Sequence, residues 1–340
     1  MPLNRPPARS GRPAWGLRLL LGGAGAGLVA VAVAVSTVPA PSQPVAVAPP
    51  ASVAPTLPAT TTTTSTAPPS TSAAGSGAKS ATPPTSAPPT TAPAPDPRPP
   101  GWSGSGCALS LTSRPAAAPV GHCTVLEIGD SLGNDLGWGL QRHLSPASGL
   151  HLVQADVSST GLVDRSFYDW PAHLATDLRR YHPQLVLASL GGNDEQGMVV
   201  DGSVQAFGTP AWQRAYLAKV TALVREATDA GAYVLWVGLP VMQQPGFSAG
   251  IATLDTLYAR AAATDRYATY LSTWELFSRP GVGFAADAEV NGSSAQVREP
   301  DGVHYGYAGE DVVATYVIRQ LAASFHVRLA PQSPAVITGW

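Results

Sequence analysis

The sequence predicts an α/β domain in which helices cover both faces of a parallel sheet. Three observations predict this fold class. Short apolar runs alternate with segments of helical spacing between residues 124 and 325. The runs Leu185–Leu190 and Tyr233–Leu239 are apolar throughout, as expected of strands buried on both faces. Pro171 stands where a helix would begin, and Pro183 follows where that helix would end. Together these features favour a three-layer α/β/α sandwich.

Each expected strand is a short apolar run, and the first of them ends at Gly129. The expected strands are Thr124–Ile128, His151–Val157, Leu185–Leu190, Tyr233–Leu239 and Ala268–Leu271. Active sites of such sheets lie at the carboxyl ends of the strands. The loops after residues 128, 157, 190, 239 and 271 are therefore where functional residues are expected.

The segments between the strands have helical spacing. The expected helices are Leu136–Leu144, Pro171–Tyr181, Pro210–Ala230, Ile251–Asp265 and Tyr307–Phe325. The third stops at Gly231, a usual C-terminal signal. The last has Val313, Val317 and Leu321 on one face, which predicts that this face packs on the sheet. No such pattern is found in residues 278–300, an insert before the last helix that could line the site or cover it.

Composition divides the chain into three parts. The 340 residues include 34 Gly and 34 Pro, and residues 36–100 contain 18 of the prolines with only three charged residues. We expect a disordered linker over residues 41–100, because this composition cannot bury enough apolar surface to fold. Residues 101–340 form the expected domain, with 14 basic and 21 acidic residues. Nucleic-acid binding requires a basic face, so this balance argues against a nucleic-acid partner.

The first 40 residues predict export. Arg5, Arg9, Arg12 and Arg18 precede the uncharged segment Leu19–Ala40. Basic residues followed by an apolar run are typical of a secretory signal or of a membrane anchor. The sequence leaves both alternatives open, but each places the rest of the chain outside the cytoplasm. The membrane, through residues 1–40, is thus an expected partner.

The two cysteines fit this location. Cys107 and Cys123 lie 16 positions apart at the start of the domain. An isolated pair outside the cytoplasm predicts a disulfide. A zinc site would need further Cys or His ligands, and only His122 is near.

Candidate oxyanion donors follow the first three strands. Ser131 lies at the first strand-to-helix turn, Gly161 in the turn after the second strand, and Asn193 after the third. The N–H groups of Ser131 and Gly161 and the amide of Asn193 could surround one developing oxyanion. Each residue also has an ordinary structural explanation: Ser131 as a helix N-cap, Gly161 as a turn glycine, and Asn193 in capping or turn chemistry.

A base for the serine comes near the C-terminus. His304 could accept the Ser131 proton, and Asp301, three residues earlier, could orient the imidazole. The other histidines form no pair at metal-ligand spacing. No catalytic metal and no cofactor are therefore expected.

These four blocks, in this order, resemble the SGNH superfamily, also called GDSL esterases, over residues 122–326. Ser131, Gly161, Asn193 and His304 match its Ser, Gly, Asn and His blocks, and Asp301 matches its triad acid. Ser159–Leu162 followed by Phe167–Pro171 is similar to an exported bacterial subgroup with an STGL…F(F/Y)DWP pattern. The resemblance implies a flavodoxin-like fold and acyl-ester chemistry. Gly133–Asp135 depart from the small polar residues usual in lipolytic members, which disfavours a lipid substrate.

The expected function is that of an extracytoplasmic serine esterase acting on a small acyl ester. The location favours an acetyl ester on a cell-envelope glycan. Two alternatives remain open at this stage. An O-acetyltransferase would use the same acyl-enzyme, and a glycan-binding module would keep the fold without the chemistry.

Overall fold

The computed structural model describes residues 98–111 and 118–340. These residues belong to one compact unit, Ser86–Trp340; a second unit, Met1–Thr85, lies outside the described residues. The expected signal or anchor in residues 1–40 and nearly all of the expected linker in residues 41–100 also lie outside them. In the part of the chain that the structure describes, no helix is both long and apolar enough to cross a bilayer.

Five parallel strands form the central sheet, in the order β3-β2-β4-β7-β8. Their bounds are Cys123–Gly129 (β2), Leu150–Gln154 (β3), Leu185–Ser189 (β4), Tyr233–Val237 (β7) and Ala268–Leu271 (β8). β2, the first strand of this sheet in chain order, pairs with both the second (β3) and the third (β4), which is the flavodoxin-like order. This topology confirms the expected fold class.

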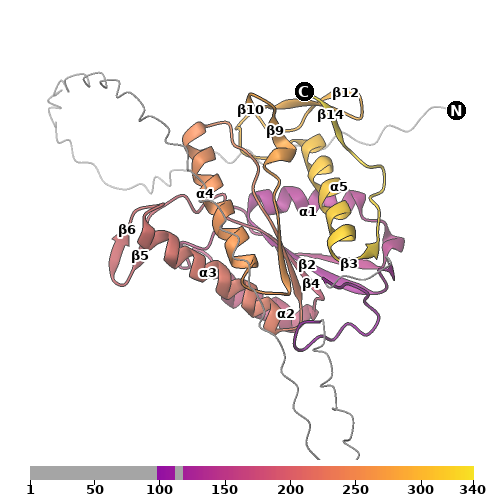
Figure 1. Ribbon diagram of the computed structural model, residues 1–340, viewed down its shortest axis with the longest axis horizontal. Helices are drawn as coiled ribbons and strands as arrows, with labels where there is room; N and C mark the ends of the chain where they lie inside the picture. Colours follow the sequence, from indigo (N-terminus) through magenta and orange to yellow (C-terminus); the bar gives the residue numbers. More distant parts are fainter. Residues whose placement is uncertain (1–97, 112–117) are drawn as a thin grey trace, which may run out of the picture. The chain divides into compact units, whose positions relative to one another are not determined.

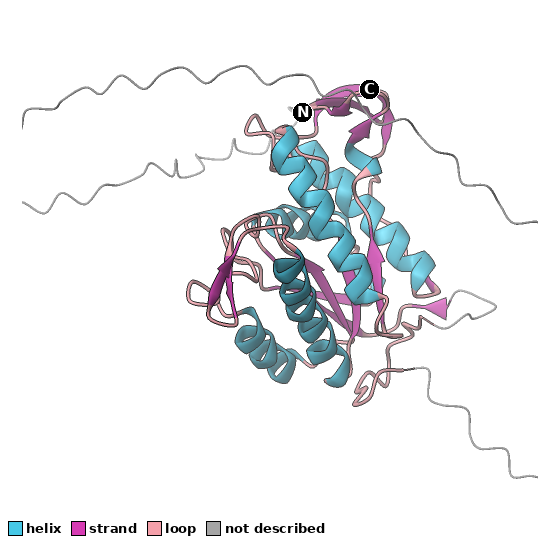
Figure 2. Ribbon diagram, turned by 60° about the vertical axis from the view of Figure 1, so that its left-hand side comes forward, coloured by secondary structure: helices cyan, strands magenta, loops and turns pink. Residues whose placement is uncertain are grey.

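Helices cover both faces of the sheet (Figures 1 and 2). They are α1 (Ser131–His143), α2 (Trp170–Tyr181), α3 (Pro210–Asp229), α4 (Pro245–Ala262) and α5 (Tyr307–Ser324). α1 and α5 pack together on one face, and α2, α3 and α4 cover the other. Two expected starts were wrong, because α1 begins at Ser131 rather than Leu136, and α4 at Pro245 rather than Ile251.

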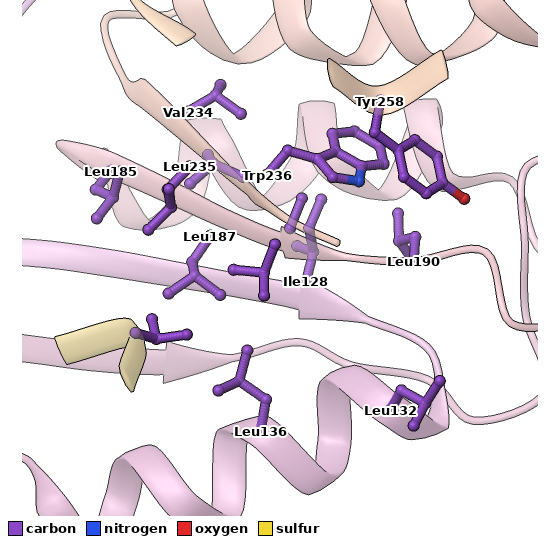
Figure 3. Packing of buried hydrophobic residues seen from close by; sticks show 14 of the residues in the cluster. Ile128, Leu132, Leu136, Leu185, Leu187, Leu190, Val234, Leu235, Trp236 and Tyr258 are labelled. Atoms are coloured by element: carbon purple, nitrogen blue, oxygen red, sulfur yellow. The ribbon is translucent and has the colours of Figure 1, made fainter. Parts of the chain in front are cut away.

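The core fills the space between these layers. Figure 3 shows Leu132 and Leu136 of α1 on one side of the sheet and Trp236 and Tyr258 on the other. The rings of Trp236 and Tyr258 stack with centroids 4.9 Å apart. All four side chains are at most 1% exposed, so the strand ends that carry the candidate residues rest on a packed base.

The shorter strands form small separate sheets outside the central one. Residues 278–300, whose role the sequence left open, form two hairpins, and the second of them pairs with β14 near the C-terminus. The remaining elements are β1 (Ala118–Pro119), η1 (Pro146–Ser148), β5 (Met198–Val200), β6 (Ser203–Gln205), η2 (Glu275–Phe277), β9 (Ser278–Arg279), β10 (Gly283–Phe284), β11 (Asp287–Val290), β12 (Ser293–Gln296), β13 (Val327–Arg328) and β14 (Ile337–Gly339).

The expected disulfide joins Cys107 to Cys123. Cys123 is the first residue of β2, so the bond lies at the opposite end of this strand from Gly129. It ties the segment before the sheet to β2, at the end of this strand that lies away from the serine turn.

Candidate active site

Ser131 stands at the junction of β2 and α1. Asp130 is the N-cap of α1, since its Oδ1 accepts a hydrogen bond from the Leu132 N–H at 3.0 Å. Ser131 is therefore the first helical residue and not the N-cap. The first N–H groups of a helix have no acceptor within it, and the helix dipole makes this end positive. The backbone thus provides a donor where the side chain provides a hydroxyl.

Ser131, His304 and Asp301 form a continuous hydrogen-bonded chain. The Ser131 Oγ lies 2.8 Å from the His304 Nε2, and the His304 Nδ1 lies 2.7 Å from the Asp301 Oδ2. The other oxygen of Asp301 accepts the backbone N–H groups of Val303 and His304, at 2.8 and 3.0 Å. Two residues 173 positions apart in the sequence are thereby brought within hydrogen-bond distance, in the arrangement of a nucleophile, a base and an orienting acid.

The Asp301 carboxyl group, the acid of this hydrogen-bonded series, remains ionised at neutral pH. Partial burial of Asp301 favours its neutral form, but hydrogen bonds from the His304 ring and from two backbone N–H groups outweigh it and lower the pKa of Asp301. The side chains of His304 and Asp301 are 34% and 49% exposed. The base therefore faces solvent rather than a closed cavity.

A buried carboxylate links the serine turn to the loop after β4. The Oδ2 of Asp130 accepts the N–H groups of Gly191 and Gly192, at 2.9 and 2.8 Å. Asp130 is fully buried, and this burial raises its pKa to about 6 against the lowering effect of its three backbone hydrogen bonds. One side chain thus fixes both the start of α1 and the loop that carries Asn193.

A second buried carboxylate, Asp194, joins that loop to the one containing Gly161. Asp194 accepts the N–H groups of Leu162 and Val163, both at 2.9 Å, and the Tyr216 hydroxyl at 2.7 Å. A Cβ on Gly161 would lie only 2.2 Å from the Asp194 Oδ1, so a glycine is required for this close approach. The turn explanation of Gly161 thus has a physical basis, and it is compatible with a donor role for its N–H.

Asn193 completes the link between the two loops, because its Nδ2 donates to the Thr160 carbonyl at 2.9 Å. This bond uses one of the two amide hydrogens and leaves the other for a ligand. Gly161 and Asn193 also line a common pocket of about 200 Å3. The structure therefore brings together the loops that carry the three expected donors, Ser131, Gly161 and Asn193.

The loop that carries the histidine rests on Arg298, a residue that the sequence analysis missed. Arg298 is fully buried, and it donates to the carbonyls of Val241 at 2.6 Å and Val303 at 2.7 Å. Its Nε donates to the His304 carbonyl at 3.4 Å. Burial lowers the pKa of Arg298 to about 10, which still leaves it a cation. Arginine is seldom fully buried, and nothing in its local sequence signals this position.

Glu127 is a second missed residue, and it lies under the serine turn. It is fully buried in β2, where Gly133 and Gly137 of α1 would each place a Cβ within 3.1 Å of its carboxyl oxygens. Burial is the largest of the causes that raise the pKa of Glu127 well above its ordinary value. A charge in the middle of the apolar run Thr124–Ile128 is the signal that could have identified it.

No three His, Cys, Asp or Glu side chains in residues 98–111 and 118–340 are grouped as a metal site requires.

Several solved structures resemble the protein. The structure of TesA has 18% identity, covers 59% of this chain and 99% of its own, and gives a TM-score of 0.41. A catalytic mutant of Axe2, an acetylxylan esterase from Geobacillus stearothermophilus, has 17% identity. The match covers 62% of this chain and 99% of the Axe2 chain, with a TM-score of 0.44. A GDSL-like lipase from Bacteroides thetaiotaomicron has 14% identity, covers 59% and 88%, and gives 0.41. At these identities the similarity concerns the fold alone.

No match was found among curated proteins. One family model, described as a protein of unknown function (DUF459), matches residues 124–320. This range contains the five strands of the sheet except for Cys123, together with the serine turn and the Asp301–His304 loop, and it is more than half of the chain. The chain therefore belongs to the DUF459 family.

Proposed function

We propose that the protein is a serine esterase that acts through an acyl-enzyme. The Ser131 Oγ attacks the carbonyl carbon of an ester, and the Ser131 proton passes to the His304 Nε2. Asp301 stabilises the imidazolium that forms. The negative charge that develops on the carbonyl oxygen is held by the N–H groups of Ser131 and Gly161 and by the Asn193 amide.

The intermediate then collapses. The bond between the carbonyl carbon and the leaving oxygen breaks, and the alcohol leaves with the proton from His304. A water molecule attacks the acyl-enzyme, gives its proton to His304, and the acid is released as the proton returns to Ser131. No redox partner and no metal enters this sequence of steps.

The observation that carries the proposal is the distance of 2.8 Å between the Ser131 Oγ and the His304 Nε2. Serine is a poor nucleophile without an adjacent base, and this contact supplies one. The exposure of His304 and Asp301 favours hydrolysis over acyl transfer, since a transferase must exclude water from the acyl-enzyme.

We further propose that the substrate is a small acyl ester, such as an acetyl group on a cell-envelope glycan, and that the domain over residues 101–340 acts outside the cytoplasm. The Cys107–Cys123 disulfide supports this location, because such bonds persist in oxidising compartments. Residues 1–40 would serve as signal or anchor, and residues 41–100 as spacer.

A fluorophosphonate probe tests the mechanism, because it reacts only with an activated serine. We expect covalent labelling at Ser131, identified by peptide mass spectrometry, and its loss in Ser131→Ala. Ser158→Ala, which changes an exposed serine of a neighbouring loop, is the matched control and should be labelled like the wild type. Labelling that persists in Ser131→Ala would overturn the proposal. If an added sugar acceptor replaces free acetate with acetylated sugar, the protein is a transferase with the same triad.

A further inference from the structure

A pocket of about 200 Å3 includes two of the proposed oxyanion donors, and its other lining residues have no role in the proposed mechanism. It is lined by Ser159, Gly161, Asp164, Phe167, Asn193, Asp194 and Gln196. Because Gly161 and Asn193 belong both to this pocket and to the proposed oxyanion hole, an ester whose carbonyl oxygen is bound by these donors lies beside the pocket. The volume is below the range of about 300–1,000 Å3 for pockets that hold drug-sized ligands, so one ring or a short chain fits.

Five of the seven lining residues have polar side chains, and none of the seven is basic. Arg165, next to Asp164 in the sequence, forms an ion pair with Asp169 at 2.7 Å instead of lining the pocket. An anionic group would meet two carboxylates, Asp164 and Asp194, and no basic side chain among these lining residues. A long acyl chain would have to displace water from carboxylate and amide groups, which is unfavourable without new hydrogen bonds.

Two acceptor oxygens at the pocket are available to a ligand. The Oδ1 of Asp164 accepts bonds from Ser166 and from the Phe167 N–H, whereas no described residue donates to its Oδ2. The Gln196 amide donates to the Asn193 carbonyl at 2.8 Å, and its Oε1 has no donor among the described residues. Such oxygens bind hydroxyl groups well.

Phe167 adds an aromatic face. Its side chain is 64% exposed, while the adjacent Tyr168 stacks on His173 at 4.1 Å and packs against Trp170 at 4.8 Å. The hydrogen bond from the Phe167 N–H to Asp164, at 3.2 Å, fixes the main chain of Phe167, and both residues line the pocket. An exposed aromatic ring next to hydroxyl acceptors is the combination that binds a pyranose, which has apolar C–H faces and a rim of hydroxyl groups.

We propose that this pocket binds a neutral sugar ring of the ester substrate, with Phe167 against the face of the ring and with Asp164 and Gln196 accepting its hydroxyl groups. The inference rests on the proposed esterase function and adds the class of the alcohol portion. It assigns specificity to the loop over residues 159–167, in a different part of the chain from the triad acid and base.

Kinetics with two substrates test the proposal. One is an O-acetylated neutral tetrasaccharide, and the other is 4-nitrophenyl acetate, which has no sugar. We expect Phe167→Ala and Asp164→Asn to lower kcat/KM on the acetylated tetrasaccharide about tenfold, mainly through KM, a loss in the range of one aromatic contact or hydrogen bond. Rates on 4-nitrophenyl acetate should stay within about twofold. Val282→Ala, at 65% exposure, is the control for loss of an exposed apolar side chain and should leave both rates unchanged.

Equal losses on both substrates, or none on the tetrasaccharide, would overturn the subsite. A loss confined to 4-nitrophenyl octanoate would identify an acyl-chain pocket instead.

Binding separates this inference from the mechanism. Full-length Ser131→Ala is titrated by calorimetry with xylotetraose, cellotetraose and mannotetraose, with and without Phe167→Ala. Binding of one of these sugars that weakens about tenfold with Phe167→Ala supports the subsite even if the wild type cleaves no ester. Binding of none of them, in a protein whose ester cleavage requires Ser131, overturns the subsite and leaves the esterase intact.

Discussion

The two halves of the candidate site are held by buried charges of opposite sign. On the serine side, the Asp130 carboxylate accepts three backbone N–H groups. On the histidine side, the Arg298 guanidinium donates to three backbone carbonyls. Among the described residues, neither charge has an oppositely charged side chain within ion-pair distance. Main-chain dipoles balance both charges, so the placement of these loops depends little on which side chains they carry.

The two halves differ in how many structural elements hold the catalytic residue in position. The serine turn lies between a buried strand and a helix whose Leu132 and Leu136 pack into the core. The Asp301–His304 loop is half-exposed, and Arg298 is the side chain that supports two of its carbonyls. Backbone bonds from Gln243 to the Gly302 carbonyl and from Glu299 to the His304 carbonyl, and the bond from the Tyr305 N–H to Asp135 at 3.1 Å, add to this support. We therefore expect the histidine half to be the more sensitive to a single substitution of a supporting residue.

The largest effect should come from removing the contact between the halves. Ser131→Ala and His304→Ala should each lower kcat by about 10⁴-fold or more, and the double variant should be no worse than either, because the two residues act as a unit. Initial rates on 4-nitrophenyl acetate measure this. Multiplicative losses in the double variant would mean that the two halves act separately.

Loss of the histidine support should have the next largest effect. Arg298→Met keeps the length but leaves the carbonyls of Val241 and Val303 without a donor, at about 1–3 kcal/mol each. A small displacement of His304 should then lower kcat about 100-fold. Arg298→Lys should restore part of the rate. Arg266→Met, which changes an exposed arginine over the Tyr267 ring, is the control. Equal kcat values for Arg298→Met and the control would refute the positioning role of Arg298.

Loss of the support under the serine should be milder. Asp130→Asn can keep the N-cap bond, but its amide would present hydrogens to the N–H groups of Gly191 and Gly192. We expect the free energy of unfolding to fall by about 1–3 kcal/mol, with kcat reduced less than in Arg298→Met. Asp169→Asn, at the N-cap of α2, is the matched control: asparagine caps a helix about as well as aspartate, so only the exposed ion pair with Arg165 is lost, which should cost little stability. If both variants lose the same stability, the bridge to the β4 loop contributes nothing.

Acidification tests the same carboxylate without a substitution. Burial raises the pKa of Asp130 to about 6, against 3.8 for an ordinary aspartate. The folded protein thus binds this proton before the unfolded chain does, and the contribution of Asp130 to the free energy of unfolding rises as pH falls from 6 towards 4. The pKa of Asp301 is lowered in the folded protein, so its protonation reduces the free energy of unfolding only at a pH below this range. Denaturant unfolding at pH 7, 6 and 5 should show this rise in the wild type and a smaller one in Asp130→Asn; identical pH dependence would contradict the assignment.

The smallest effect on catalysis should come from the far end of β2. Replacing both Cys107 and Cys123 by serine should lower stability by about 3 kcal/mol on the chain-entropy model. The kcat at a permissive temperature should be unchanged, since the bond lies at the opposite end of the strand from the serine turn. Thermal unfolding and initial rates measure the two quantities separately. A large fall in kcat would show that loss of the disulfide disturbs the serine turn through β2.

The strands and the short motifs could be predicted because each depends on local sequence. The apolar runs Leu185–Leu190 and Tyr233–Leu239 needed no partner to be recognised. The start of α1 was missed because Gly133 and Gly137 lower helix propensity. Glycine is needed at both positions because of a tertiary contact: a side chain at either one would meet the buried Glu127 carboxyl group. The start of α4 was missed for lack of periodicity before Ile251, although Pro245 follows the capping residue Gln244.

The supports of the site could not be predicted from the sequence. A lone Asp, Glu or Arg is expected at the surface, and only long-range folding buries Asp130, Glu127 and Arg298. The partners of Asp130 and Arg298 are backbone groups up to 62 residues away. Every residue has such groups, so the sequence does not show which of them will be partners. The small sheet of β11, β12 and β14 was missed for the same reason, since β14 lies more than 40 residues along the chain.

The contact between Gly161 and Asp194 has a consequence for variation within the family. The carboxylate occupies the space that any side chain at position 161 would need. A substitution at one position alone is therefore unfavourable, whereas a shorter residue at 194 would make room for alanine at 161. We expect the two positions to covary among DUF459 sequences. Directed evolution of this loop should then succeed only with libraries that randomise both positions together.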